Sequence, residues 1–258
     1  MKRVGGVFLP VLALVLLLAA TSGAGVMLVD RSGSRTLISG GKFKEVSEED
    51  AQTMIFDVNS GVLTIVDRER QAYSSGTVDE FCSEASGAIG AAMEGMSEEE
   101  RAMVRQFMEM AKQKKPQAPP DVRVTGTGSG GEIAGLPTTK YRVEVNGALF
   151  EEIWLTDDEA ILKEFRSLSK LADMTSKMAG CTLGEAGLDV SSSPYATPQF
   201  RELFTKGYPL KMRSYGEGSV SDQEEVVEVR KEAIPDSEFD PPGGYRKISF
   251  GEMLQQER

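Results

Sequence analysis

Short runs of apolar residues, separated by turn residues, fill the segment from Gly25 to Ser75. These strand-like runs lie at 26–29, 36–39, 42–46, 54–56, 62–66 and 71–74. Asn59-Ser60-Gly61 separates two of them, as the turn of a β-hairpin does. Strands this close in sequence pair antiparallel, because parallel neighbours need long crossover connections. The pattern predicts a meander of six short strands.

Helical spacing of apolar residues replaces this pattern after residue 76. Thr77 to Glu80 and Ser97 to Glu100 have the sequence of capping boxes, in which a hydroxyl and a carboxylate satisfy the free amides of a first helical turn. Apolar residues recur at helical spacing behind each box. Pro116 to Pro120 then requires an extended link. Two helices are therefore expected between the meander and this link.

A second block of strands is predicted from Val122 to Leu155. Residues 140–146 alternate between apolar and polar, and Asn146-Gly147 is a strong hairpin signal. The returning strand carries the only tryptophan, Trp154. The sheet therefore gains three strands here.

The remainder of the chain alternates between helix and strand signals. A third capping box, Thr156 to Glu159, predicts the longest helix, which ends near Met178 with Gly180 as its terminator. Thr197-Pro198 predicts the start of a short helix, because proline is favoured at the first helical position. Two further alternating strands are expected at 208–215 and 226–234.

The element order defines the expected fold class. About eleven strands and three or four helices, with no internal repeat and no long linker, indicate one α+β domain over residues 25–249. Helices grouped against one face of an antiparallel sheet are the economical arrangement. Residues 250–258 are predicted to be a frayed tail.

The first 24 residues have the pattern of a signal peptide. Lys2 and Arg3 precede an uncharged, leucine-rich run from 4 to 20, and Ser22 and Ala24 are small residues at cleavage-site spacing. Cleavage near Ala24 predicts a periplasmic or secreted protein with no permanent membrane anchor. The alternative is an uncleaved anchor, since 17 residues is close to the minimum that spans a bilayer.

Composition then excludes several classes of function. The chain has 29 Lys and Arg against 40 Asp and Glu, a formal net charge of -11, and no basic patch, which disfavours nucleic-acid binding. It contains no histidine and only two cysteines, which excludes His-based catalysis, His-ligated zinc, four-thiolate zinc sites and iron–sulfur clusters. No cofactor and no metal are expected. No local pattern singles out a catalytic pair, so we expect no enzyme activity.

Two polar motifs invite a site interpretation. Gly126 to Gly131 is glycine-rich but lacks the Gly-Lys-Ser/Thr ending of a phosphate-binding loop, and a turn between strands is the better interpretation. Asp157, Asp158 and Glu159 resemble a cation site, but acidic residues are also favoured at a helix start. Capping of the following helix is preferred.

Export changes the interpretation of Cys82 and Cys181. Two cysteines in an oxidising compartment usually form a disulfide, here predicted to join the first helix to the end of the long helix. Two separate buried thiols remain the alternative, because sequence does not give their distance.

Three segments together carry a resemblance. "GVLTIVDRERQAY", "GGEIAGLPTTKYRVEVNGALFEEIWLTDD" and "DPPGGYRKIS" resemble an uncharacterised family of bacterial envelope proteins, which carries a domain of unknown function with the LolA/LolB-like fold of lipoprotein carriers. Gly135, Tyr141, Trp154 and the Pro-Gly-Tyr245 ending are the best matches, and residues 181–206 are longer than the usual pattern. The resemblance implies an antiparallel half-barrel whose concave apolar face is covered by helices and holds acyl chains or other lipids.

Methionine in the predicted helices agrees with this implication, because methionine adapts to varied apolar partners. The residues are Met93, Met96, Met103, Met108, Met110, Met174 and Met178. The first hypothesis is a carrier of a hydrophobic ligand or lipidated protein between sheet and helices, with Met103, Phe107, Phe165, Leu168, Tyr141 and Trp154 as lining residues. The second is a structural or interaction module of the envelope whose core is simply filled.

Overall fold

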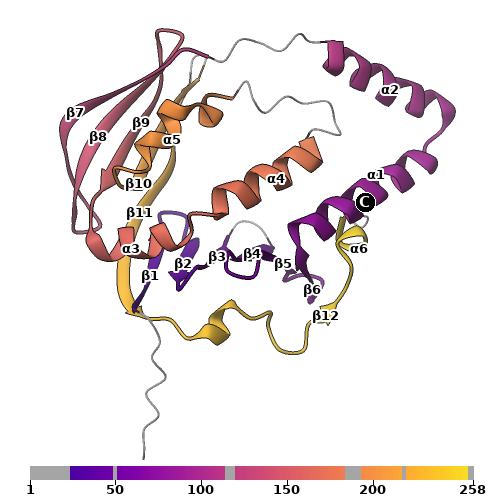
Figure 1. The fold of residues 1–258 in the computed structure, drawn as a ribbon, viewed down its shortest axis with the longest axis horizontal. Helices are drawn as coiled ribbons and strands as arrows, with labels where there is room; N and C mark the ends of the chain where they lie inside the picture. Colours follow the sequence, from indigo (N-terminus) through magenta and orange to yellow (C-terminus); the bar gives the residue numbers. More distant parts are fainter. Residues whose placement is uncertain (1–23, 49–50, 114–119, 184–192, 217–218, 255–258) are drawn as a thin grey trace, which may run out of the picture.

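The computed structural model describes residues 24–48, 51–113, 120–183, 193–216 and 219–254 (Figure 1). The signal peptide predicted over residues 1–24 lies almost entirely outside this described part. The chain begins with the predicted meander of short strands. They are β1 (Ala24–Asp30), β2 (Arg35–Ser39), β3 (Lys42–Val46), β4 (Gln52–Asp57), β5 (Val62–Asp67) and β6 (Ala72–Thr77).

Two helices follow, α1 (Val78–Glu94) and α2 (Glu98–Gln113). Both predicted capping boxes are present. The Thr77 hydroxyl accepts from the Glu80 amide while the Glu80 carboxylate accepts from the Thr77 amide, at 3.2 and 2.7 Å. Ser97 and Glu100 repeat the exchange at the start of α2. The local sequence therefore sets where each helix begins.

Three long strands come next, β7 (Val122–Ile133), β8 (Leu136–Val145) and β9 (Ala148–Thr156). Asn146 and Gly147 both have positive φ, 51° and 83°, as the predicted tight hairpin turn requires. The glycine-rich stretch from Gly126 to Gly131 is not a turn between strands. It lies inside β7, where the register shifts at two bulges.

The single long helix predicted after β9 is two helices, α3 (Glu159–Ser167) and α4 (Leu171–Leu183). Leu168 ends α3 and is buried against the sheet, and this tertiary contact accompanies a break that no glycine or proline signals. The predicted cap was also misplaced, because Asp158, not Thr156, accepts the Ile161 amide. Gly180, expected to end the helix, lies within α4.

The remainder contains α5 (Pro198–Leu203) after a 3-10 turn at Pro194–Ala196, then β10 (Tyr208–Gly216) and β11 (Ser219–Ala233). Beyond a second 3-10 turn, Asp236–Phe239, lie β12 (Arg246–Lys247) and α6 (Phe250–Leu254). The tail expected to fray from residue 250 is thus helical over its first five residues. Phe250 and Met253 are buried, which explains why this segment is ordered.

All twelve strands form one sheet in the order β12-β6-β5-β4-β3-β2-β1-β11-β10-β9-β8-β7. The neighbours pair antiparallel except β12 and β6, which are parallel. β12 and β7 occupy the two edges, so the sheet is open. Within the described residues the fold is α+β with six α-helices, one strand and two or three helices more than expected.

One face of the sheet is covered by helices (Figure 1). Phe81 of α1 packs on Phe56 and Leu63, and Leu168 at the end of α3 packs on Ile38. Further along the sheet, Ile161 of α3 and Leu210 of β10 share a cluster with β1, and α5 covers β7 to β9 through Phe200 and Leu203. We call this the helix-covered face.

The opposite face of β2 to β6 is covered by the C-terminal segment 234–248, which runs along the lower edge of the view in Figure 1. Ile234, Phe239 and Tyr245 pack there with Leu37 and Ile55. The Lys44 ammonium donates to the Glu238 carbonyl at 2.6 Å, and burial lowers the pKa of Lys44 despite the nearby Glu238 carboxylate. We refer to residues 234–248 as the C-terminal strap.

The predicted disulfide is present. Cys82 of α1 and Cys181 of α4 are joined, with their Cα atoms 5.5 Å apart and 99 residues between them in sequence. Met174 and Met178 of α4 pack in the same cluster as Phe81 and Phe56. The bridge therefore fixes together two helices that cover the same part of the sheet.

Candidate functional site

Two of the six predicted lining residues, Phe165 and Leu168, lie between helix and sheet. Leu168 is 4% exposed and packs with Ile38 and Val58. Phe165 makes an edge-to-face contact with Tyr208 of β10, with ring centroids 5.1 Å apart. Both residues fill the space beneath α3, so they support the sheet surface rather than face an open cavity.

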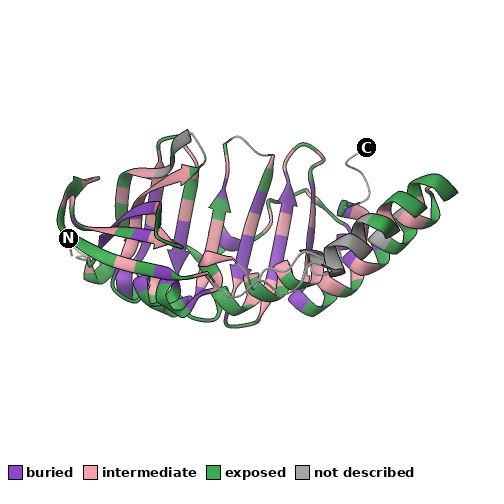
Figure 2. Cartoon of the chain, turned by 90° about the horizontal axis from the view of Figure 1, so that it is seen from above, coloured by how far each residue is buried: buried purple, intermediate pink, exposed green. Residues whose placement is uncertain are grey.

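The pair predicted on the second helix lies elsewhere. Met103 of α2 is 65% exposed, and the Phe107 side chain is outside the described part of the structure. α2 extends beyond α1 at the end of the molecule farthest from β7 to β11 (Figure 1), where exposed residues predominate in Figure 2. Met103 therefore does not line the helix-covered face.

Tyr141 and Trp154 lie on opposite faces of the sheet. Tyr141 of β8 is paired with Ile153, and Lys140 is paired with Trp154. Successive side chains of a strand point to opposite faces, and Tyr141 and Ile153 share the cluster under α5. Trp154 is consequently on the face away from α5. The expectation that both line one cavity does not hold.

Trp154 is instead the centre of a charged cluster on that outer face. The Lys140 ammonium lies 4.7 Å from its ring centroid, and Lys211 and Arg213 lie within 6 Å, as cation–π contacts require. Lys140 also pairs with Glu152 at 2.7 Å. Burial raises the pKa of Glu152, but hydrogen bonds from Lys140 and Tyr215 outweigh it, and the net shift is downward. The paired charges indicate a stabilising surface cluster.

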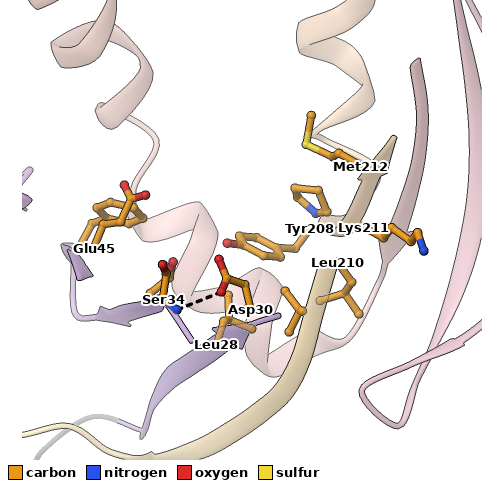
Figure 3. Close-up of a pocket in the computed structure, with 12 residues that line it drawn as sticks. Leu28, Asp30, Ser34, Glu45, Tyr208, Leu210, Lys211 and Met212 are labelled. Carbon is orange, nitrogen blue, oxygen red and sulfur yellow. Dashed lines mark hydrogen bonds between the residues drawn. The ribbon is translucent and has the colours of Figure 1, made fainter. Parts of the chain in front are cut away.

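A pocket opens on the helix-covered face where β1 to β3 meet β10 and β11 (Figure 3). Its volume is about 180 Å³. Apolar side chains form one part of its wall, namely Leu28, Phe43, Leu210, Met212 and Val226, together with Pro209. Polar groups form the rest, namely Asp30, Ser34, Thr36, Glu45, Tyr208 and Lys211. This is the best-defined ligand-sized space that we find among the described residues.

Neighbouring contacts hold the pocket wall in place. The Asp30 carboxylate accepts from the Ser32 hydroxyl at 2.7 Å and from the Ser34 amide at 2.9 Å, which fixes the turn between β1 and β2. Phe165 of α3 supports the Tyr208 ring from behind. A predicted lining residue thus positions the pocket without lining it.

Sequence analysis named none of the residues that line this pocket. They come from five strands, two of which lie about 180 residues after the first in sequence. No motif joins them, since they meet only through the pairing of β1 with β11. The alternating pattern of the strands was the one available signal, and it identifies a face rather than a site.

The acidic residues at the start of α3 act as the preferred interpretation expected. Asp158 caps the helix and pairs with Lys231 of β11 at 2.6 Å. Burial raises its pKa, but hydrogen bonds from Lys231 and from the Ile161 amide give a net lowering. Among the described residues no group of three acidic or cysteine side chains is placed to hold a metal ion.

One buried carboxylate is less well satisfied. Glu151 of β9 is fully buried, and one of its oxygens accepts from the Tyr195 hydroxyl at 2.6 Å and from the Ser214 hydroxyl at 2.9 Å. The other oxygen has no hydrogen-bond partner. Burial and the Glu151 carboxylate both raise the pKa of Tyr195. The arrangement ties Tyr195, which precedes α5, to the sheet.

Taken together, the fold and the pocket define a class of protein: an α+β domain with one open, largely antiparallel sheet, helices on one face and a small mixed pocket beneath them. The chain belongs to the family described as domain of unknown function (DUF4412), whose profile matches residues 90–245. The match includes the long strands and most of the C-terminal strap. It is shorter than the 25–249 over which the sequence resemblance was drawn.

The other comparisons add little. A crystal structure of MucB is similar at 12% sequence identity and a TM-score of 0.29, with 87% of this chain and 60% of that chain covered. This chain thus spans less than two thirds of that protein, and a TM-score this low does not equate the two folds. No curated protein matches this chain in sequence. Within the described residues, no helix has the length and apolar character needed to cross a membrane.

Proposed function

We propose that this protein is exported and binds an apolar group, without catalysis, in the pocket beneath α3. The observation that carries the proposal is the pocket itself, because it lies on the helix-covered face and has an apolar wall. Clefts with a largely apolar lining and a few placed polar groups are the usual form of ligand sites.

The volume of the pocket limits what enters it. A dry apolar cavity of about 150 Å³ is enough for benzene, whereas pockets for whole drug-sized ligands measure about 300–1,000 Å³. A pocket of about 180 Å³ therefore accepts one ring or a short branched alkyl group. We infer that only one end of a lipid, or one apolar group of a lipidated partner, is held there. The remainder of such a ligand lies outside the pocket.

The export and carrier parts of the proposal have separate support. A disulfide between Cys82 and Cys181 fits an oxidising compartment, and the sequence before residue 24 has the pattern of a signal peptide. An open antiparallel sheet with helices on one face is compatible with the LolA/LolB-like architecture that the sequence resembles. We therefore propose a periplasmic carrier or receptor for an apolar group.

A neutral fluorescent probe with a terminal phenyl ring, N-phenyl-1-naphthylamine, tests the proposal. The folded protein is expected to bind it saturably, with about one site per chain. Thr36→Phe places a ring in the pocket from β2 and is expected to weaken binding at least tenfold. Thr125→Phe is the matched control, because Thr125 is an exposed strand threonine in β7. Equal loss in both variants, or no saturable binding by the native protein, contradicts the proposal.

A filled-core interaction module is the second candidate. It is favoured by the packing of Leu168 on Ile38 and Val58, which leaves no room for a complete acyl chain there. If this candidate is correct, the native protein gives no saturable probe signal, and Thr36→Phe has an effect only on stability.

A further inference from the structure

The pocket beneath α3 has a charged side as well as an apolar one. We propose that it binds an alkylammonium group, with the hydrocarbon part of the ligand against the apolar wall and its cationic nitrogen near Asp30 and Glu45. This inference rests on the proposed function, because it names the class of ligand for the same pocket.

The charges that face the pocket are of one sign. Asp30 at the end of β1 and Glu45 of β3 both contribute to its wall. Lys211 is the only cationic lining residue, but its ammonium points away across β10 (Figure 3) and pairs with Glu225 at 2.5 Å. Since the Lys211 ammonium lies on the Trp154 side of the sheet, the charged groups of the lining residues that face the pocket are the two carboxylates.

Two aromatic rings add to this preference. Phe43 and Tyr208 line the pocket, and Figure 3 shows the Tyr208 ring extending from β10 towards the strand that carries Ser34. The negative face of an aromatic ring attracts cations, and alkylammonium ligands are commonly bound by such rings. Phe165 keeps the Tyr208 ring in place from the α3 side. Carboxylates and rings thus favour the same ligand charge.

Other ligand charges fit less well. The carboxylate of a free fatty acid would approach Asp30 and Glu45, and like charges at short range repel. A bare metal ion is also a poor match, because one Asp30 oxygen already accepts two hydrogen bonds and the adjoining wall is apolar. An amphiphile with a positive nitrogen satisfies both parts of the wall.

Three small ligands with the same ring test the inference: 2-phenylethylammonium, 2-phenylethanol and 3-phenylpropionate. Binding is measured by calorimetry and by the NMR shifts of the Leu28, Leu210 and Met212 methyl groups. The ammonium is expected to bind about tenfold more tightly than the alcohol, and the propionate most weakly. Equal affinities for ammonium and alcohol overturn the inference and leave the proposed function in place. Absence of binding by all three overturns both.

Variants separate the pocket carboxylates from the general negative charge of the protein. Asp30→Asn with Glu45→Gln is expected to remove the preference for ammonium over alcohol. The asparagine amide keeps an oxygen acceptor for the β1–β2 turn, and Glu45 is exposed, so Glu45→Gln alone serves if the double variant does not fold. Glu94→Gln, exposed at the end of α1, is the matched control and retains the preference. A preference that survives in the double variant overturns the inference.

Discussion

The sheet has two regions that are covered in different ways. The meander region, β1 to β6 with β12, has short strands and is buried on both faces, by α1, α3 and α4 on one and by the C-terminal strap on the other. The long-strand region, β7 to β11, is covered on one face by α5, while its other face carries the charged cluster around Trp154.

The difference shows why the pocket lies where it does. A region sealed on both faces leaves no accessible space, and a region with a single short helix leaves its surface wide and shallow. The two coverings meet where β1 pairs with β11, and α3 crosses this line through Ile161, Leu28 and Leu210. The pocket opens beside that crossing. It therefore belongs to the boundary between the regions.

The largest expected effect concerns the disulfide over the meander region. Cys82→Ser with Cys181→Ser is expected to lower the free energy of unfolding by about 4 kcal/mol, because a 99-residue separation gives the unfolded chain much more freedom. Urea unfolding measures the change, and reduction of the native protein should reproduce it. Hydrogen exchange should quicken in β4 to β6 before β8 and β9. A loss below about 1 kcal/mol, or two reactive thiols in unreduced native protein, contradicts this prediction.

The next effect tests whether the strap seals the second face of the meander region. Phe239→Ala removes a ring that is 7% exposed and packed against Leu37 and Ile55, and should cost about 3 kcal/mol. Arg142→Ala, on an exposed position of the long-strand region, should change stability by less than about 0.5 kcal/mol. Similar costs for the two variants in thermal unfolding would remove the contrast between the regions.

A smaller effect of opposite sign is expected in the long-strand region. Glu151→Gln keeps an oxygen for the Tyr195 and Ser214 hydroxyls and removes a buried charge that has one unpartnered oxygen. Unfolding should require about 1 kcal/mol more free energy at neutral pH, because the charge no longer has to be desolvated. Glu144→Gln, on a half-buried position of β8, serves as the comparison. A clear loss of stability in Glu151→Gln would show that the charge itself is needed.

The smallest effect lies at the boundary and depends on pH. Asp158→Ala should cost about 1 kcal/mol at pH 7 through loss of the α3 cap, and Asp157→Ala should have little effect. The folded pKa of Asp158 is below its ordinary value of 3.8, so its stabilisation is complete above that value and declines as pH falls through the folded pKa. Unfolding curves from pH 7 to 2.5 should therefore converge. A constant gap would indicate that the carboxylate charge has no part in the cap.

Local signals predicted the meander region well. Its strands are separated by tight turns, and its first helix begins at a capping box that acts as the sequence suggests. The break after α3 was missed because it depends on the burial of Leu168 against β2, which is distant in sequence. Thr156 was mistaken for a cap because it is a buried strand residue beside the true cap, Asp158.

The candidate site was predicted only in part. Alternation along β8 and β9 already implies which residues share a face, yet Tyr141 and Trp154 were placed together from their apolar character alone. The pocket residues depend on the pairing of β1 with β11 and on α3 lying across it, and neither is a local property. The cysteine pairing was predictable because it needed only two residues and a compartment.

The C-terminal strap has a consequence for the order of folding during synthesis. β1 pairs with β11, and β6 pairs with β12 about 170 residues later in the chain. A nascent chain that has reached only the meander lacks both partners and the strap over its second face. Contacts this distant in sequence slow folding and leave strand surfaces open in the meantime. Completion of the first region must therefore wait for the last segment to emerge.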